Sequence, residues 1–293
     1  MSKFKQDIIA KAVADLSDLK AIKPVCHQQQ EESPMPSVEV LEEIVMLVRS
    51  VIFPGFFGNS SVNSKTIKRH IKRSIEKLAE RLTQQILAGL CCDKEQAYDK
   101  NSCVKQAQSV TESFISRLSL IRQALTSDVM AAYNGDPAAK NYGEIIFCYP
   151  AIRAISNYRI AHELLLLGVP LIPRIITEMA HSETGIDIHP GAKIGHFFTI
   201  DHGTGVVIGE TAIIGNNVKL YQGVTLGAKS FPLDEQGNPI KGIDRHPILE
   251  DDVIVYSNAT ILGRITIGKG SVIGGNVWVD TDVAANSKVL QKK

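Results

Sequence analysis

Residues 186–227 read IDIHPGAKIGHFFTIDHGTGVVIGETAIIGNNVKLYQGVTLG, and an aliphatic residue returns in them at intervals of six. The rhythm resumes over residues 249–279, and many of the aliphatic residues are followed directly by glycine. Such a hexapeptide repeat predicts a left-handed parallel β-helix, in which each hexad forms a short strand and a corner, and three hexads close a triangular coil. The thirteen repeat positions are Ile188, Ile194, Ile200, Ile208, Ile214, Leu220, Leu226, Leu249, Val255, Ile261, Ile267, Ile273 and Val279.

Thirteen hexads make a little over four coils. The coils are expected to stack into a prism, because one coil cannot bury its apolar side chains alone. Glycine permits the corner conformations that other residues resist. A β-sandwich, the competing fold, would show period-two alternation and hairpin turns, and the repeat segment has neither.

Upstream of the repeat, apolar residues recur with helical periodicity. Helices are expected over residues 37–53, 65–90, about 105–130 and 143–180, the last interrupted by Pro150, Pro170 and Pro173. The predicted fold class is therefore α+β. An all-α N-terminal domain over residues 1–182 is followed by a β-helix domain over residues 183–293.

The charge of the chain gives no sign of a polyanionic partner, since the net charge is +1. Locally, the helix expected over residues 65–90 has a basic side opposite its apolar face. This side could attract an anion, but a solvated helix surface is the favoured interpretation. Its residues are Lys68, Arg69, Lys72, Arg73 and Lys77.

Composition places the chain among soluble globular proteins, with 44% hydrophobic and 22% charged residues. No apolar run approaches the ~18 residues that suggest a membrane span. The opening stretch mixes charged and apolar residues like an amphipathic helix and does not resemble a signal peptide. The five cysteines are odd in number and lack metal-ligand spacing. We therefore expect a cytoplasmic protein without a bound metal and without nucleic-acid or membrane partners.

The repeat is first interrupted between Ile200 and Ile208, where the spacing is eight instead of six. The extra residues fall within Asp201-His-Gly-Thr-Gly205. Insertions in a repeat protein map to surface loops, where function is concentrated. His202 is therefore the natural candidate for proton transfer, because the pKa of imidazole lies near neutral pH.

A histidine base is usually held in one tautomer by a carboxylate on its other ring nitrogen. Asp187 precedes His202 by nearly the length of one coil of three hexads, so stacking could bring the two together. Asp201 and Glu210 are further carboxylates nearby. A surface-loop histidine without a role is the alternative, and the position of His202 at the repeat defect argues against it.

The second interruption is an extended loop at residues 227–247, which is polar and rich in glycine and proline. It ends in Asp244-Arg245-His246. Unstructured loops of this length are uncommon in compact domains and are usually functional lids or disordered. A purely structural prism has no need of such a loop, which argues against a scaffolding protein.

Zinc-dependent hydration is a second class of chemistry that β-helices carry, and it requires three histidines converging on a metal. Four histidines could supply them, but no pair has metal-ligand spacing and His189 directly precedes a proline. The four are His189, His196, His202 and His246.

Several strings around the two interruptions resemble a known family. They are residues 135–138 (GDPA), 156–162 (SNYRIAH), 187–195 (DIHPGAKIG), 201–211 (DHGTGVVIGET), 223–227 (GVTLG) and 244–247 (DRHP). Together they resemble the serine O-acetyltransferases, a family of hexapeptide-repeat acyltransferases, over about residues 130–280. The repeat is shared with other acetyltransferases, whereas the strings that begin at Asp187, Asp201 and Asp244 point to the serine-specific branch.

The resemblance implies transfer of the acetyl group of acetyl-CoA, as co-substrate, to the hydroxyl of L-serine, which gives O-acetylserine for cysteine biosynthesis. His202 corresponds to the general base and Asp187 to the carboxylate paired with it. Carboxylates would pair with the serine ammonium, and Arg245 and His246 would receive its carboxylate. The implied substrate-binding residues are Asp136, Asp201, Glu210, Arg245 and His246, and the implied cofactor-binding residues are Gly227, Ala228 and Ser257.

The resemblance also implies a homotrimer, with a dimer of trimers as the larger alternative, and inhibition by cysteine at the serine site. Family members that end in isoleucine dock into O-acetylserine sulfhydrylase. This sequence ends in Val-Leu-Gln-Lys-Lys293, so that complex is not expected. An acetyltransferase acting on a sugar or an antibiotic hydroxyl is the alternative enzyme. Asp136 together with Arg245 favours serine, because a zwitterion needs both an anion and a cation.

Overall fold

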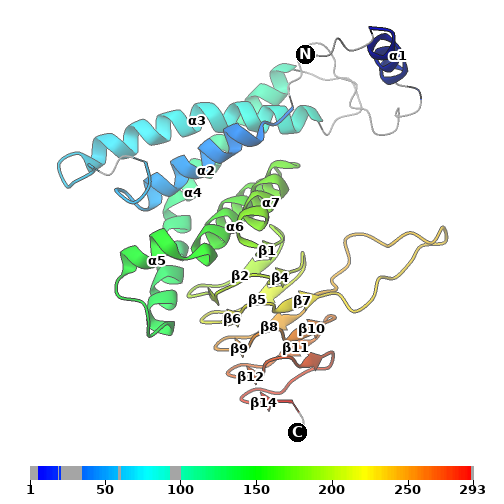
Figure 1. Ribbon diagram of the computed structural model, residues 1–293. Helices are drawn as coiled ribbons and strands as arrows, with labels where there is room; N and C mark the ends of the chain where they lie inside the picture. Colours follow the sequence, from blue (N-terminus) through cyan, green and yellow to red (C-terminus); the bar gives the residue numbers. More distant parts are fainter. Residues whose placement is uncertain (1–5, 19, 21–34, 59–60, 93–99, 292–293) are drawn as a thin grey trace.

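The computed structural model describes residues 6–18, 20, 35–58, 61–92 and 100–291. In these residues seven helices precede fourteen short strands (Figure 1). The helices are α1 (Gln6–Ser17), α2 (Val38–Ile52), α3 (Ile67–Cys92), α4 (Lys100–Gly135), α5 (Tyr142–Cys148), α6 (Pro150–Leu166) and α7 (Ile172–Thr184). The strands are β1 (Asp187–Ile188), β2 (Lys193–Ile194), β3 (Thr199–Asp201), β4 (Val207–Ile208), β5 (Ile213–Ile214), β6 (Lys219–Tyr221), β7 (Thr225–Gly227), β8 (Ile248–Leu249), β9 (Ile254–Val255), β10 (Thr260–Leu262), β11 (Thr266–Ile267), β12 (Val272–Ile273), β13 (Trp278–Val279) and β14 (Lys288–Val289).

The helices begin and end where the sequence gives the signals for it. The Ser37 side chain caps α2 by accepting a hydrogen bond from the Val40 N–H. Pro150 stands in the first turn of α6, and Pro173 in that of α7, where no helical N–H is lost. Gly185 ends α7 with a φ of 69°. The stretch expected to be helical over residues 143–180 is therefore three helices, separated at its prolines.

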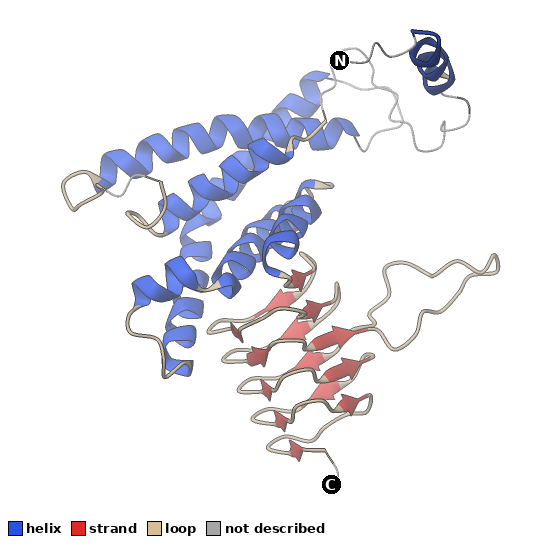
Figure 2. Cartoon of the chain, in the orientation of Figure 1, coloured by secondary structure: helices blue, strands red, loops and turns tan. Residues whose placement is uncertain are grey.

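The strands form the three faces of a triangular prism, in which every ladder is parallel (Figure 2). The first sheet has the order β1-β4-β7-β10-β13, the second β2-β5-β8-β11, and the third β3-β6-β9-β12-β14. This arrangement confirms the predicted α+β fold with a parallel β-helix. The change from helix to strand falls between Thr184 and Asp187.

The register of the coils follows the two interruptions of the repeat. Ile208 pairs with Leu226, three hexads further along the chain, which is one regular coil. Ile188 pairs with Ile208, although the coil between them contains the first interruption and is two residues longer. Ile214 pairs with Leu249, although the whole extended loop stands between them. Both insertions leave the ladder and its inward-facing side chains undisturbed.

The prism core consists of the repeat residues themselves. Nearly all of the aliphatic residues of the hexads are buried, and so are the small residues four positions after them, such as Ala192 and Ala259. The apolar faces of α2, α3, α4 and α6 form a continuous core with the first coil. No helix in the described part of the chain is both long and apolar enough to cross a membrane.

A buried ion pair joins the helices to the first coil. Arg159 of α6 donates to both carboxylate oxygens of Asp128 in α4, at 3.1 Å each. The same guanidinium donates to the carbonyls of Ile194 and Gly195, and the Phe198 N–H donates to Asp128. Burial raises the pKa of Asp128, and Arg159 opposes this. Removal of one partner alone would leave an unpaired buried charge, at a cost of about 3–5 kcal/mol.

Candidate functional site

Most of the residues singled out from the sequence lie at the two corners of the prism where the strands of the first sheet begin and end. One edge, the His202 corner, is formed by the turns that lead from the third sheet to the first, including residues 202–206. The other edge, the Arg245 corner, is formed by the turns that lead from the first sheet to the second, including residues 189–192, 209–212 and 244–247.

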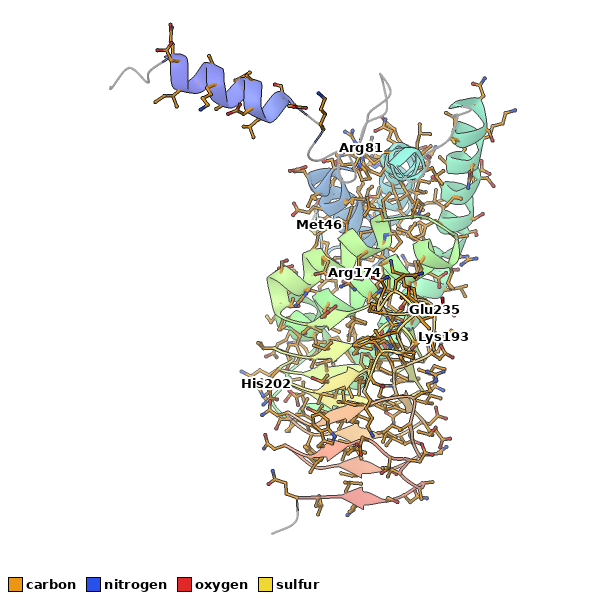
Figure 3. The ribbon with its side chains drawn as sticks, turned by 90° about the vertical axis from the view of Figure 1, so that its right-hand side faces the viewer. Met46, Arg81, Arg174, Lys193, His202 and Glu235 are labelled. Atoms are coloured by element: carbon orange, nitrogen blue, oxygen red, sulfur yellow. The ribbon has the colours of Figure 1, made fainter. Side chains whose placement is uncertain are left out.

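His202 lies in a two-residue bulge of the coil. Asp201 pairs with Tyr221, and the Gly223 N–H donates to the carbonyl of Thr204 at 3.0 Å. Three residues therefore stand between Asp201 and Gly205, where the next coil has only Gln222 between Tyr221 and Gly223. The side chain of His202 is 77% exposed and points away from the prism (Figure 3).

The backbone at His202 has an uncommon conformation. His202 has a φ of 59°, in the left-handed region that non-glycine residues rarely adopt. Gly203 follows with a φ of 105°, and a Cβ atom there would lie 2.5 Å from Cδ1 of Ile186. The bulge therefore depends on glycine directly after the histidine.

Asp136 reaches the His202 corner from the end of α4. The Tyr149 hydroxyl donates a hydrogen bond to its carboxylate, and the Ala138 N–H donates another at 2.8 Å. These bonds lower the pKa of Asp136, so its carboxylate stays ionised. The hydrogen bond to Asp136 in turn raises the pKa of Tyr149 to about 12.

Lys219 connects the helical part to this corner. Its ammonium lies 3.0 Å from Oδ2 of Asp201 and donates to the carbonyl of Gly135 at 2.8 Å. It also lies 4.7 Å from the ring centroid of Tyr221. The other oxygen of Asp201, Oδ1, lies 3.9 Å from Nε2 of His202, which is beyond hydrogen-bonding distance.

Neither Tyr149 nor Lys219 was identified from the sequence, because no motif marks them. The coil register would have found Lys219, since it pairs with Thr199 beside Asp201. Tyr149 is placed by the turn between α5 and α6, which sequence periodicity does not specify.

At the Arg245 corner, the Arg245 guanidinium donates to Oε2 of Glu210 at 2.7 Å. Burial tends to raise the pKa of Glu210, but this hydrogen bond and the nearby positive charges outweigh it, and the pKa is lowered. Arg264 fixes the end of the loop by donating to the carbonyls of Thr211 and His246, at 2.6 and 3.0 Å.

His246 is buried, and its tautomer is set by the backbone. Its Nδ1 accepts a hydrogen bond from the Thr211 N–H at 3.1 Å, so in the neutral ring the proton is on Nε2. Burial, followed by the charge of Arg245, lowers the pKa of His246 to about 4. The ring is therefore neutral at pH 7 and offers one N–H donor.

His189 is a neighbour at this corner that the sequence suggested only for the zinc alternative. Its Nδ1 accepts from the Gly191 N–H at 3.0 Å, and burial lowers its pKa. Like His246, it is a neutral ring whose N–H group is at Nε2.

Asp187 lies on the outer side of β1 and faces the helices. Its carboxylate is 3.9 Å from Nη1 of Arg174, and one of its oxygens lies within 4.8 Å of ligand atoms of Glu178 and His181. Among the described residues, no hydrogen bond or ion pair joins Asp187 to His202. Within one chain these two side chains are therefore not a hydrogen-bonded pair.

The residues expected to bind the cofactor are divided between the corners. Gly227 and Ala228 leave β7 at the Arg245 corner, where the Gly227 carbonyl accepts from the Gly263 N–H at 3.0 Å. Ser257 belongs to the His202 corner, since the Asn258 N–H donates to the carbonyl of Gln222 in the preceding coil.

The four histidines of the zinc alternative do not converge within the chain. His189 and His246 lie at the Arg245 corner with Nδ1 engaged by backbone N–H groups. His202 lies at the other edge of the first sheet. His196 follows β2 at the third corner, with Nδ1 3.5 Å from Oγ of Ser127.

The similar proteins found by sequence and by structure carry the same name. No family model matches the chain. A serine acetyltransferase of Synechococcus elongatus is 51% identical over 262 residues, which cover 88% of this chain and 82% of that protein. Entamoeba histolytica serine acetyltransferase 1, solved in complex with L-cysteine, has a TM-score of 0.74 and 36% identity, covering 94% of this chain and 93% of that one. Soybean serine acetyltransferase complexed with serine has a TM-score of 0.56 and 28% identity, covering 88% of this chain and 98% of that one.

Proposed function

This chain belongs to the serine acetyltransferase family and is an acyltransferase, and we propose that it transfers the acetyl group of acetyl-CoA to the hydroxyl of L-serine with His202 as general base. His202 removes the hydroxyl proton as the serine oxygen attacks the thioester carbonyl. The carbon–sulfur bond breaks, and the histidinium returns the proton to the leaving thiolate. A hydroxyl is a weak nucleophile at neutral pH without such a base.

One observation carries the assignment of the base. The chain departs from its repeat by two residues at His202, and the bulge presents the imidazole to solvent with 77% of the side chain exposed. His246, by contrast, is buried, and its Nδ1 is engaged by the Thr211 N–H. His202 is free to meet a substrate at the edge of the first sheet.

Charge supports an amino acid as the acceptor. Asp136 is held ionised by Tyr149 and suits the substrate ammonium, while Arg245 and the Nε2–H of His246 suit its carboxylate. A sugar hydroxyl would need neither charge. Since the soybean relative is a complex with serine and the Entamoeba relative a complex with L-cysteine, we extend the same site to cysteine as a competing ligand.

The two groups of residues lie on opposite edges of the first sheet, so one chain does not assemble them. A contact between two different surfaces of identical copies can repeat around a closed ring. A ring of three copies in which the His202 corner of one copy meets the Arg245 corner of the next would complete the site. We therefore propose a homotrimer with a shared site at each interface, in which Asp187 of a neighbouring copy is available to His202. Gly227, Ala228 and Ser257 would line the groove for acetyl-CoA between the same two edges.

Replacement of His202 by asparagine tests the base. Asparagine tolerates the left-handed backbone of this position better than most residues, so the bulge should be kept while the base is lost. We expect kcat to fall about 10²–10⁴-fold with serine, which is the usual contribution of general base catalysis, with little change in the melting temperature. Thiol release from acetyl-CoA measures the rate.

His196→Asn is the matched control, because His196 is an exposed histidine at the corner that carries no proposed site residue. It should retain the activity of the unmodified protein. Full turnover by the His202→Asn protein would rule out His202 as the base.

A further inference from the structure

A hollow of about 210 Å³ lies beside the first turns of α3, in the helical part of the chain. None of the described residues that line it carries a carboxylate. The lining combines three basic side chains with three hydroxyl groups: the residues are Ser61, Val62, Thr66, Arg69, His70, Arg73 and Ser74. The polarity of this lining is that of a site for an anion.

The two arginines in the lining have no acidic partner among the described residues. Three other cations of the same helix are paired, since Lys72 forms an ion pair with Glu76, and both Lys77 and Arg81 with Glu43. Arg69 and Arg73 are four residues apart and so lie on one side of α3, where two like charges repel each other. An anion between them would remove this repulsion.

The walls of the hollow are fixed by packing. Nε2 of His70 lies 3.1 Å from the carbonyl of Ser50 in α2, so this nitrogen carries a proton and donates it. Ser74 is buried. On the other side, the Asn63 N–H donates to Oγ1 of Thr66 at 3.0 Å, and the Thr66 N–H donates back to Oδ1 of Asn63. His70, Ser74 and Thr66 are therefore held in place, while the exposed side chains of Arg69 and Arg73 border the hollow.

The size of the hollow selects a small ligand. It is smaller than the ~300–1,000 Å³ of pockets for drug-sized molecules. Guanidinium groups bind phosphate oxygens in a two-pronged fashion, and hydroxyl groups donate to the remaining oxygens. We propose that this hollow binds a phosphate group, either the free ion or the phosphate of a small monoester.

Titration calorimetry on the full chain tests the site, with inorganic phosphate and glycerol 3-phosphate as separate probes and with sodium chloride at equal ionic strength as reference. We expect one site per chain for at least one of the two probes. The double variant Arg69→Gln, Arg73→Gln should weaken that binding at least tenfold. Glutamine keeps the helix propensity of these exposed positions, so the fold should be retained.

The double variant Lys68→Gln, Lys72→Gln is the matched control, because it removes the same charge from the same helix at residues that do not line the hollow. It should weaken binding less than threefold. Tighter binding of glycerol 3-phosphate would identify a phosphorylated metabolite as the source, and tighter binding of phosphate would identify the free ion. The proposal is overturned if neither probe binds above the chloride reference, or if both double variants weaken binding equally.

Discussion

Side chains at the Arg245 corner are packed so closely that one added methyl group would clash with a neighbour. Gly209 has an ordinary φ, so the backbone would accept other residues there. A Cβ atom on Gly209 would, however, lie 2.0 Å from Cδ2 of His246, whose ring is held by Thr211. Glycine at this position is therefore required by the histidine and not by the turn.

We predict that Gly209→Ala displaces the His246 ring, because the added methyl group would overlap with it. The displaced imidazole would lose its hydrogen bond with Thr211. The expected result is a loss of about 1–3 kcal/mol of stability, as for overpacked cores, together with a higher KM for serine. Urea unfolding and initial rates measure the two effects. The double variant Gly209→Ala, His246→Ala should recover most of the stability, and a failure to do so would place the strain elsewhere.

For single residues, the sequence identifies those that interrupt a repeat. It does not identify residues that contact the site only because the fold brings distant parts of the chain together. His202 stands out because it falls in a gap of eight residues within a period of six. Asp136 was reached only through the family resemblance. Lys219 sits at a regular strand position, and it meets Gly135 from 84 positions away along the chain and Asp201 from the next coil. No local sequence pattern predicts such long-range contacts.

Among the elements, the strands were the most predictable, because the hexapeptide period fixes both the inward-facing residue and the corner. The helices follow from their apolar periodicity, and the breaks within residues 143–180 from the prolines there, whereas the helix expected over about residues 105–130 extends from Lys100 to Gly135. The long loop was predicted only as an interruption. Its local structure, the bridge between Leu233 and Pro239 and the turn at residues 234–238, depends on turn chemistry within a polar segment that has no period.

We predict that this loop can be shortened without loss of the fold. Every residue from Lys229 to Asp244 is exposed, and β8 pairs with β5 and β11 whatever the length of the connection. Replacement of residues 230–241 by Gly-Gly should shift the melting temperature by less than about 4 °C, because closure entropy varies slowly with loop length. Differential scanning calorimetry is the measurement.

A one-residue deletion inside a coil is the contrast to that variant. Removal of Asn217 would shift the following hexads, so that the side chains of β6 turn from the core to the surface. This protein should not fold. If the shortened loop destabilised the chain as much as this deletion, the loop would be part of the core and the prediction would be wrong.

For the whole molecule, the division of the site between two edges leads to a complementation test. The variants His202→Asn and Arg245→Ala should each be almost inactive as pure proteins. In a shared site, each interface uses His202 of one copy and Arg245 of the next. Randomly mixed trimers of the two variants in equal amounts should therefore regain about a quarter of the wild-type activity, since one interface in four pairs two intact corners.

The mixture is made by joint unfolding and refolding, with each variant refolded alone as the control. Thiol release from acetyl-CoA in the presence of serine gives the activity. If the mixture is no more active than the separate variants, the complete site lies within one chain and the proposed interface is wrong.

The buried Arg159–Asp128 pair also bears on how the protein is made. A ribosome releases the chain from the N-terminus, so both charges emerge before residues 194–198, which supply the carbonyls of Ile194 and Gly195 and the N–H of Phe198. The Tyr158 hydroxyl likewise lacks its acceptor, the carbonyl of Ala192, until that residue has emerged. The helices of the nascent chain therefore have polar groups without their partners until the first coil has left the exit tunnel. During translation, completion of the helical part depends on the first turn of the prism.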